Sequence, residues 1–142
     1  MPSESSTLKR KSHAVSIGPD RAPARSMLRA AGLTDDDMGK PFVAIANLAS
    51  DVTPCNVHLH RVAAAVKKGV RSANEVPFMF GTITVSDGIS MGTEGMKASL
   101  VSREVIADSI ETATFGGGMD GLIVVAACDK NMPGALMAMA RL

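Results

Sequence analysis

Two patterns of apolar and polar positions alternate along the chain after residue 41. Two short runs, residues 42–47 and 121–126, are almost wholly apolar, which is typical of buried β-strands. A third run, residues 79–85, is rich in β-branched side chains and also predicts a strand. Between these runs, apolar residues recur at the three- and four-residue spacing of an amphipathic helix. This spacing predicts one helix over residues 59–70 and a second that begins at Ser102. A third helix is expected over residues 135–142.

This alternation predicts an α/β fold in which helices flank a parallel β-sheet. A strand followed by a helix, repeated three times, implies right-handed crossovers between parallel strands. The first 20 residues lack the pattern, because they are rich in serine and charged side chains and end at Gly18-Pro19. A short helix over residues 22–31 follows. We therefore expect a flexible amino-terminal arm over residues 1–20 and an α/β domain over residues 21–142.

Composition and charge exclude several classes of protein. The 142 residues are 46% hydrophobic, which suits one domain, and 15 basic side chains against 14 acidic ones leave no broad positive surface. Tryptophan and tyrosine are absent and there are only four phenylalanines, so base-stacking platforms are not expected and neither is a nucleic acid partner. No apolar run is long enough to span a bilayer, and the start does not resemble a secretory signal. We expect no membrane association and a cytoplasmic location.

Thiols, carboxylates and a lysine follow the three predicted strands. Cys55 comes after the first apolar run, Asp87 after the second, and Cys128, Asp129 and Lys130 directly after the third. The carboxyl ends of parallel strands lie at one edge of a sheet, and open α/β folds bind their ligands at that edge. The sequence therefore predicts that these five residues converge on one site.

The chemistry of this residue set leaves alternatives open. Thiolates select zinc, copper(I) or iron–sulfur centres, whereas carboxylates select magnesium, manganese or calcium, so the mixed set favours two neighbouring metal centres. By spacing alone, two cysteines far apart in the sequence fit two small buried apolar side chains better than a metal site. Asp87-Gly88 is also a common turn sequence. Lys130 fits either an ion pair with Asp129 or, after carbamylation, a metal ligand.

Four longer motifs occur in a characteristic order. They are TPCNVHL at residues 53–59, VSDGISMGTEGM at 85–96, SREVIADSIE at 102–111 and CDKNMPG at 128–134. Together they resemble the amino-terminal part of the dihydroxy-acid dehydratase family, and the resemblance runs from about residue 22 to the last residue. The expected fold is then an incomplete amino-terminal domain of a larger two-domain enzyme.

The resemblance implies a hydro-lyase of valine and isoleucine biosynthesis. Such enzymes convert 2,3-dihydroxy-3-methylbutanoate and 2,3-dihydroxy-3-methylpentanoate to 2-oxo acids with an iron–sulfur cluster and Mg²⁺. By position, Cys55 and Cys128 match two of three cluster cysteines, and a cysteine at position 55 suggests the [2Fe–2S] branch of the family. Asp87 and Asp129 match magnesium ligands, and Lys130 matches a lysine that binds magnesium through a carbamate.

The chain also departs from the family pattern. A third cluster cysteine, a glutamate ligand to magnesium and a serine base have no counterpart in the 142 residues. We therefore expect a fragment that is inactive alone, holds no catalytic residue and forms a homodimer when full length. The alternatives are a sugar-acid dehydratase of the same superfamily and a non-catalytic truncated product. Pro133-Gly134 and residues 89–92 favour the branched-chain enzyme.

Overall fold

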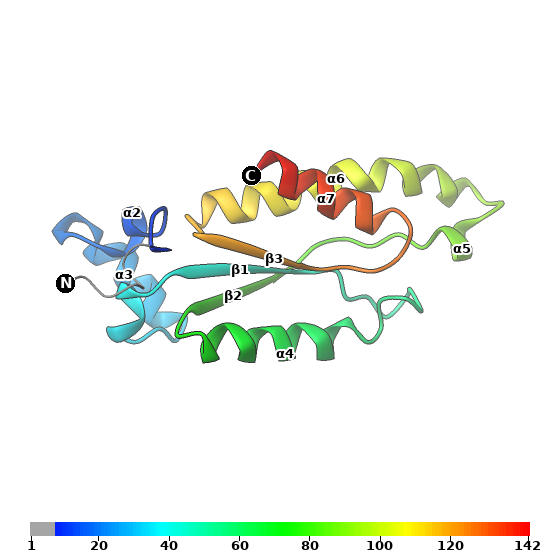
Figure 1. Cartoon of the computed structure of the whole chain (residues 1–142). Coiled ribbons are helices and arrows are strands. Elements are labelled where there is room, and N and C mark those ends of the chain that lie inside the picture. The colour runs from blue at the N-terminus through cyan, green and yellow to red at the C-terminus, as the bar shows by residue number, and fades with distance from the viewer. Residues whose placement is uncertain (1–7) are drawn as a thin grey trace.

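A three-stranded parallel β-sheet forms the centre of the computed structural model, which describes residues 8–142 (Figure 1). The strand order is β2-β1-β3, with β1 (Phe42–Asn47) between β2 (Val76–Gly81) and β3 (Gly121–Val125). In this register Ala44 lies opposite Phe78 on one side and Leu122 on the other. The parallel sheet and its flanking helices confirm the predicted fold class.

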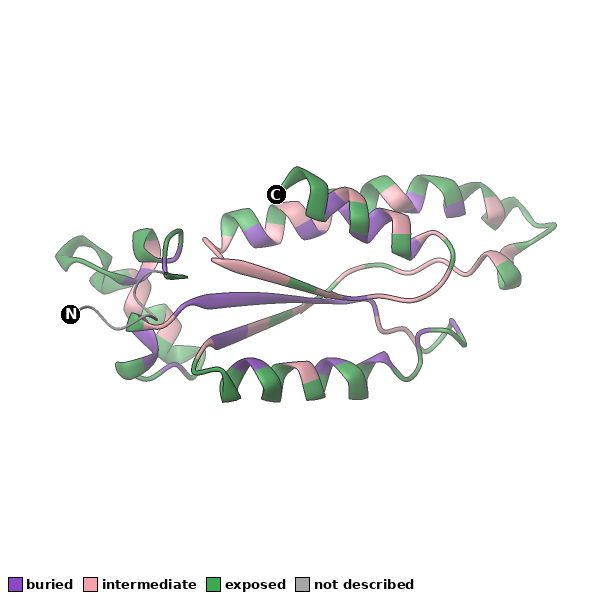
Figure 2. Ribbon diagram, in the orientation of Figure 1, coloured by how far each residue is buried: buried purple, intermediate pink, exposed green. Residues whose placement is uncertain are grey.

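Helices cover both faces of the sheet. Helix α4 (Leu59–Ser72) lies on one face, while α6 (Lys97–Gly116) and α7 (Asn131–Arg141) lie on the other (Figure 1). Because side chains alternate along a strand, Val43 and Ile45 pack toward α4 whereas Ala46 packs toward α6 and α7. All six residues of β1 are therefore buried (Figure 2). Within residues 8–142, no helix is both long and apolar enough to cross a membrane.

Shorter elements complete the chain. Those that precede β1 are α2 (His13–Ser16), η1 (Pro19–Arg21), α3 (Ala22–Ala30) and η2 (Asp36–Gly39). Two more, α5 (Asp87–Ser90) and η3 (Glu94–Met96), lie between β2 and α6. The elements before β1 lie near the amino-terminal ends of the strands, and α5 lies beyond their carboxyl ends (Figure 1).

Several predicted boundaries are wrong by a few residues. The second strand was expected over residues 79–85, but β2 begins at Val76 and ends at Gly81, close to the end of its partner β1. The second long helix begins at Lys97 instead of Ser102, whose hydroxyl donates to the Ser99 carbonyl inside the helix at 2.6 Å. The last helix begins at Asn131 instead of residue 135. Pro133 fits within its first turn, because the backbone N–H that proline lacks would have no acceptor in the helix there.

Asp120 joins the amino-terminal segment to the sheet. Its carboxylate accepts hydrogen bonds from the backbone N–H groups of Arg10, Lys11, Ser12 and Phe42 at 2.7–3.0 Å. Burial alone would raise the pKa of Asp120, but the hydrogen bonds from Ser12, Phe42 and Lys11 outweigh it and lower the pKa. The flexibility expected for residues 1–20 stays a prediction, and residues 1–7 lie outside the described part of the chain.

Helices α6 and α7 approach each other closely at Gly134. A Cβ atom added there would lie 3.0 Å from the carbonyl oxygen of Arg103 and 3.0 Å from Cγ2 of Ile106. We expect Gly134→Ala to lower the free energy of unfolding by about 1–3 kcal/mol, because the helices must separate to admit the methyl group. Urea unfolding followed by circular dichroism measures this change.

A matched glycine in an open position provides the control. A Cβ atom at Gly69, in α4, meets no other atom within 4 Å. Gly69→Ala is therefore expected to raise the free energy of unfolding by up to about 1 kcal/mol through helix propensity. Equal stability of Gly134→Ala and the wild type would contradict the close packing described for α6 and α7.

Candidate functional site

The segments that follow the three strands converge at one end of the sheet. Cys55 lies in the turn between β1 and α4, and Asp87 is the first residue of α5 after β2. Cys128, Asp129 and Lys130 lie in the short connection between β3 and α7. This end lies opposite α2 and α3 (Figure 1). The structure thus brings together the segments that the sequence predicts to form one site.

The thiols of Cys55 and Cys128 form a pair. Both are free, and Cys55 lies near enough to Cys128 to influence the pKa of its thiol. Burial raises the pKa of the Cys128 thiol, the backbone N–H of Asp129 opposes this shift, and the adjacent Cys55 side chain reinforces it. Cys128 has a φ of 75°, in the left-handed region that non-glycine residues rarely adopt. Such backbone strain is concentrated at functional positions.

Two carboxylates meet at the ammonium group of Lys130. Lys130 Nζ lies 2.9 Å from Oδ2 of Asp87 and also pairs with Oδ2 of Asp129. The other oxygen of Asp87 accepts a hydrogen bond of 2.5 Å from the Ser99 hydroxyl. The hydrogen bonds from Ser99 and then Lys130 lower the pKa of Asp87, while Asp129 and then Asp87 raise the pKa of Lys130. The two carboxylates therefore lie around one positive charge.

The thiol pair and the carboxylate pair adjoin each other. Cys128 directly precedes Asp129 and Lys130 in the connection between β3 and α7, and the negative charge of Asp87 contributes to the raised pKa of the Cys128 thiol. Soft sulfur donors thus lie beside hard oxygen donors. Among the described residues, no group of three or more His, Cys, Asp or Glu side chains is close enough to hold a metal ion. Each pair supplies two candidate donor groups.

The sequence pattern missed Ser99. Its side chain, in a residue that is only 1% exposed, fixes one oxygen of Asp87 and so orients the other toward Lys130. The pattern placed the start of this helix at Ser102, which left Ser99 ahead of the predicted helix with no defined orientation. An earlier helix start would have placed Ser99 and Ser102 on one face, three residues apart.

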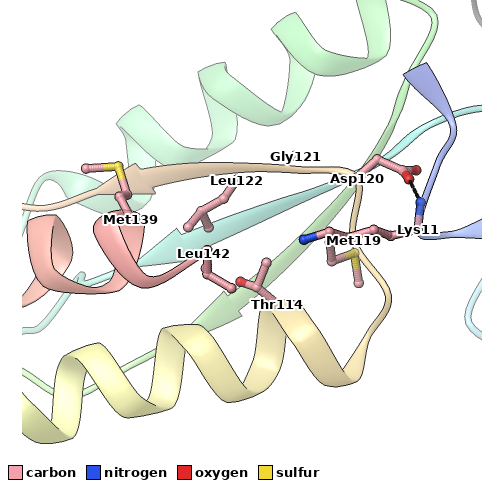
Figure 3. Close-up of a pocket in the computed structure, with 8 residues that line it drawn as sticks. All are labelled: Lys11, Thr114, Met119, Asp120, Gly121, Leu122, Met139 and Leu142. Carbon is pink, nitrogen blue, oxygen red and sulfur yellow. Dashed lines mark hydrogen bonds between the residues drawn. The ribbon is translucent and has the colours of Figure 1, made fainter. Parts of the chain in front are cut away.

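A separate pocket lies at the amino-terminal end of β3. It has a volume of about 310 Å³, and its lining includes Lys11, Met119, Asp120 and Leu142 (Figure 3). The backbone N–H of Lys11 donates to Asp120 at its edge. The pocket contains none of the five predicted site residues. It is therefore distinct from the thiol and carboxylate pairs, which lie beyond the opposite ends of the strands.

Comparisons with known proteins assign the chain to a family. The family described as dihydroxy-acid/6-phosphogluconate dehydratase N-terminal matches residues 40–142. A protein of Crocosphaera subtropica named dihydroxy-acid dehydratase is 60% identical over 132 residues, which are 93% of this chain and 24% of that protein. Proteins of the same name from a Synechococcus species and Natronomonas pharaonis are 61% and 56% identical over 93% and 92% of this chain, and over 24% and 22% of their own lengths.

These matches confirm the resemblance inferred from the four motifs. The chain spans about a quarter of the length of the curated relatives it matches. The family match covers all four motifs and all five predicted site residues. The chain therefore belongs to the dihydroxy-acid/6-phosphogluconate dehydratase family and corresponds to its amino-terminal region.

Proposed function

We propose that this chain forms part of the metal site of a dihydroxy-acid dehydratase, a hydro-lyase of valine and isoleucine biosynthesis. The substrates would be 2,3-dihydroxy-3-methylbutanoate and 2,3-dihydroxy-3-methylpentanoate, and the products their 2-oxo acids. The observation that carries this proposal is the thiol pair beside the carboxylate pair, in a chain whose relatives are named dihydroxy-acid dehydratases. We infer further that the longer protein acts in the cytoplasm as a homodimer.

The donor set suits the two metal groups that the family resemblance implies. Cys55 and Cys128 would hold a [2Fe–2S] cluster together with a ligand from elsewhere in the longer protein. Asp87 and Asp129 would bind Mg²⁺, which prefers carboxylate oxygen. In support, the two carboxylates already lie around the positive charge of Lys130. Carbamylation of the Lys130 amine would replace that charge with a further anionic oxygen ligand.

The reaction needs a site that binds a dihydroxy acid and polarises its oxygens. Overall, C2 loses a proton and C3 loses hydroxide, and the resulting enol tautomerises to the 2-oxo acid. When bound, the cluster and Mg²⁺ supply Lewis acidity toward the substrate's hydroxyl and carboxylate oxygens. This chain contributes the orientation: Ser99 fixes Asp87, and the short connection from β3 to α7 fixes Cys128 beside Asp129 and Lys130. We assign no proton acceptor to these residues.

A chimeric enzyme tests this function. The 132 residues that align with the Crocosphaera subtropica protein replace the corresponding segment of that protein. The purified chimera is reconstituted with iron, sulfide and Mg²⁺ without oxygen and then assayed for 2-oxo acid, with the parent protein prepared in parallel. We expect turnover of 2,3-dihydroxy-3-methylbutanoate.

The same assay separates the alternatives. Gluconate and xylonate are tested beside the branched-chain substrate. Activity on the sugar acids alone would support the sugar-acid dehydratase instead. A folded chimera that is inactive on every substrate, beside an active parent, would support a non-catalytic product and contradict the proposal.

A further inference from the structure

A partly buried polar network joins the segments that carry the candidate site. The hydroxyl of Thr84 donates to the carbonyl oxygen of Leu48 at 3.0 Å. It accepts from Nδ2 of Asn131 at 3.1 Å and from Nδ2 of Asn56 at 3.4 Å. Asn56 Nδ2 also donates to the Leu48 carbonyl at 2.5 Å. A hydroxyl offers one donor and two acceptor positions, so all three positions of Thr84 are used.

The members of this network come from all three strand ends. Leu48 follows β1 directly, Thr84 lies three residues after β2, and Asn131 begins α7 after β3. Asn56 is the immediate neighbour of Cys55, and Asn131 is the immediate neighbour of Lys130. The network therefore connects, through side chains, the segments that bear the two thiols and the carboxylates.

The burial of the two asparagines indicates a directional role. Both are 0% exposed, and neither amide oxygen has a hydrogen-bond partner among residues 8–142. A buried carbonyl oxygen without a partner lowers stability, so these side chains are poor choices for packing alone. Their Nδ2 groups, in contrast, make specific contacts to Thr84. The asparagines are thus explained by what they hold in place.

Residues close in sequence to Cys55 and Cys128 are anchored by this network. Cys55 is exposed, so little packing of its own fixes it, whereas the adjacent Asn56 is anchored at Leu48 and Thr84. Cys128 adopts a strained backbone that the surrounding structure must maintain, and Asn131 anchors that connection three residues later.

We propose that Thr84 is a positioning residue that sets the separation of the Cys55 and Cys128 thiols by holding Asn56 and Asn131. The role in catalysis rests on the proposed function, because the thiol pair would serve the cluster. The geometric role does not, since it concerns the chain without metal. Removal of the Thr84 hydroxyl should loosen the thiol pair while the sheet stays folded.

Bifunctional alkylation of the thiols measures this separation in the 142-residue chain. Dibromobimane becomes fluorescent after both of its arms have reacted, and Cys55 and Cys128 are the two cysteines of the sequence. The fluorescence rate is divided by the rate of alkylation with a monofunctional reagent. Thr84→Val keeps the side-chain shape and removes the hydroxyl, and we expect it to lower this ratio about five-fold or more.

Three further variants isolate the hydroxyl of Thr84. Thr84→Ser keeps the hydroxyl and should stay within about two-fold of the wild type. Thr82→Val removes a neighbouring hydroxyl that bonds Ser109 outside the network, and should leave the ratio unchanged. Asn131→Ala removes only the bond between Thr84 and the start of α7, next to the segment that bears Cys128. It is expected to lower the ratio as Thr84→Val does. Urea unfolding shows which variants are folded.

Several results would overturn the proposal. One is an unchanged ratio in folded Thr84→Val or, if that variant does not fold, in folded Asn131→Ala. Another is an equal fall in Thr82→Val, which would indicate general loosening. A wild-type ratio no higher than that in urea would mean that no thiol pair exists. The measurement uses no iron or magnesium. A thiol pair that is loosened in Thr84→Val, together with an inactive chimera, would therefore reject the proposed function and leave the positioning role of Thr84 standing.

Discussion

Replacement of either thiol by serine is expected to abolish the activity of the reconstituted chimera. Cys55→Ser and Cys128→Ser each exchange a soft thiolate for a hard, protonated hydroxyl, which binds iron–sulfur clusters poorly. We expect iron content to fall and the turnover rate to drop at least about 100-fold, a loss larger than that typical of residues that only hydrogen-bond a metal ligand. Iron and sulfide per polypeptide, the visible absorbance of the cluster and kcat are measured together.

The Thr82 hydroxyl, outside the candidate site, provides the control for the cysteine variants. Thr82→Val alters a side chain whose partner, Ser109, lies outside the thiol and carboxylate pairs. It should retain both iron and activity. A serine variant that keeps the iron content and turnover of the unmodified chimera would show that its thiol is not a ligand.

Asp87→Asn is expected to weaken magnesium binding and leave the cluster in place. The amide keeps the shape of the side chain and an oxygen for the Ser99 hydroxyl, but it loses the negative charge that attracts a hard dication. We expect the Mg²⁺ concentration for half-maximal activity to rise by about 10- to 100-fold, with unchanged iron content. Magnesium titration of the reconstituted chimera measures the shift.

A carboxylate on the outer surface of α6 is the matched control. Asp108 is exposed and pairs with Arg141, away from the candidate site. Asp108→Asn should leave the magnesium dependence as it is. Loss of iron in Asp87→Asn, or the same magnesium dependence as in Asp108→Asn, would contradict the assignment of Asp87 to the dication.

The sequence predicted the central strand well and its neighbours less well, for a physical reason. Residues 42–47 are apolar on both faces because helices cover both faces, so burial and pattern agree for β1. Residues 82–85 are all β-branched, yet they form no strand, because the partner strand ends at Asn47. Pairing partners, which a local pattern cannot supply, decide where β2 ends.

The candidate site was predictable at the level of topology. Since parallel strands bring their carboxyl ends to one edge, the segments of Cys55, Asp87 and Cys128 had to approach one another. The contacts of Ser99, Thr84 and Asn131 depend on loop conformation and on the exact start of a helix, and no spacing in the sequence encodes them. The roles of the five site residues as metal ligands stay predictions.

Diffraction at the iron absorption edge tests the central claim most directly. Crystals of the reconstituted chimera should give an anomalous iron signal bonded to the sulfur atoms of Cys55 and Cys128. Electron density without iron signal should lie between the carboxylates of Asp87 and Asp129, next to that signal. Iron bound to other residues, or sulfur atoms of the two cysteines on opposite sides of the molecule, would contradict the account.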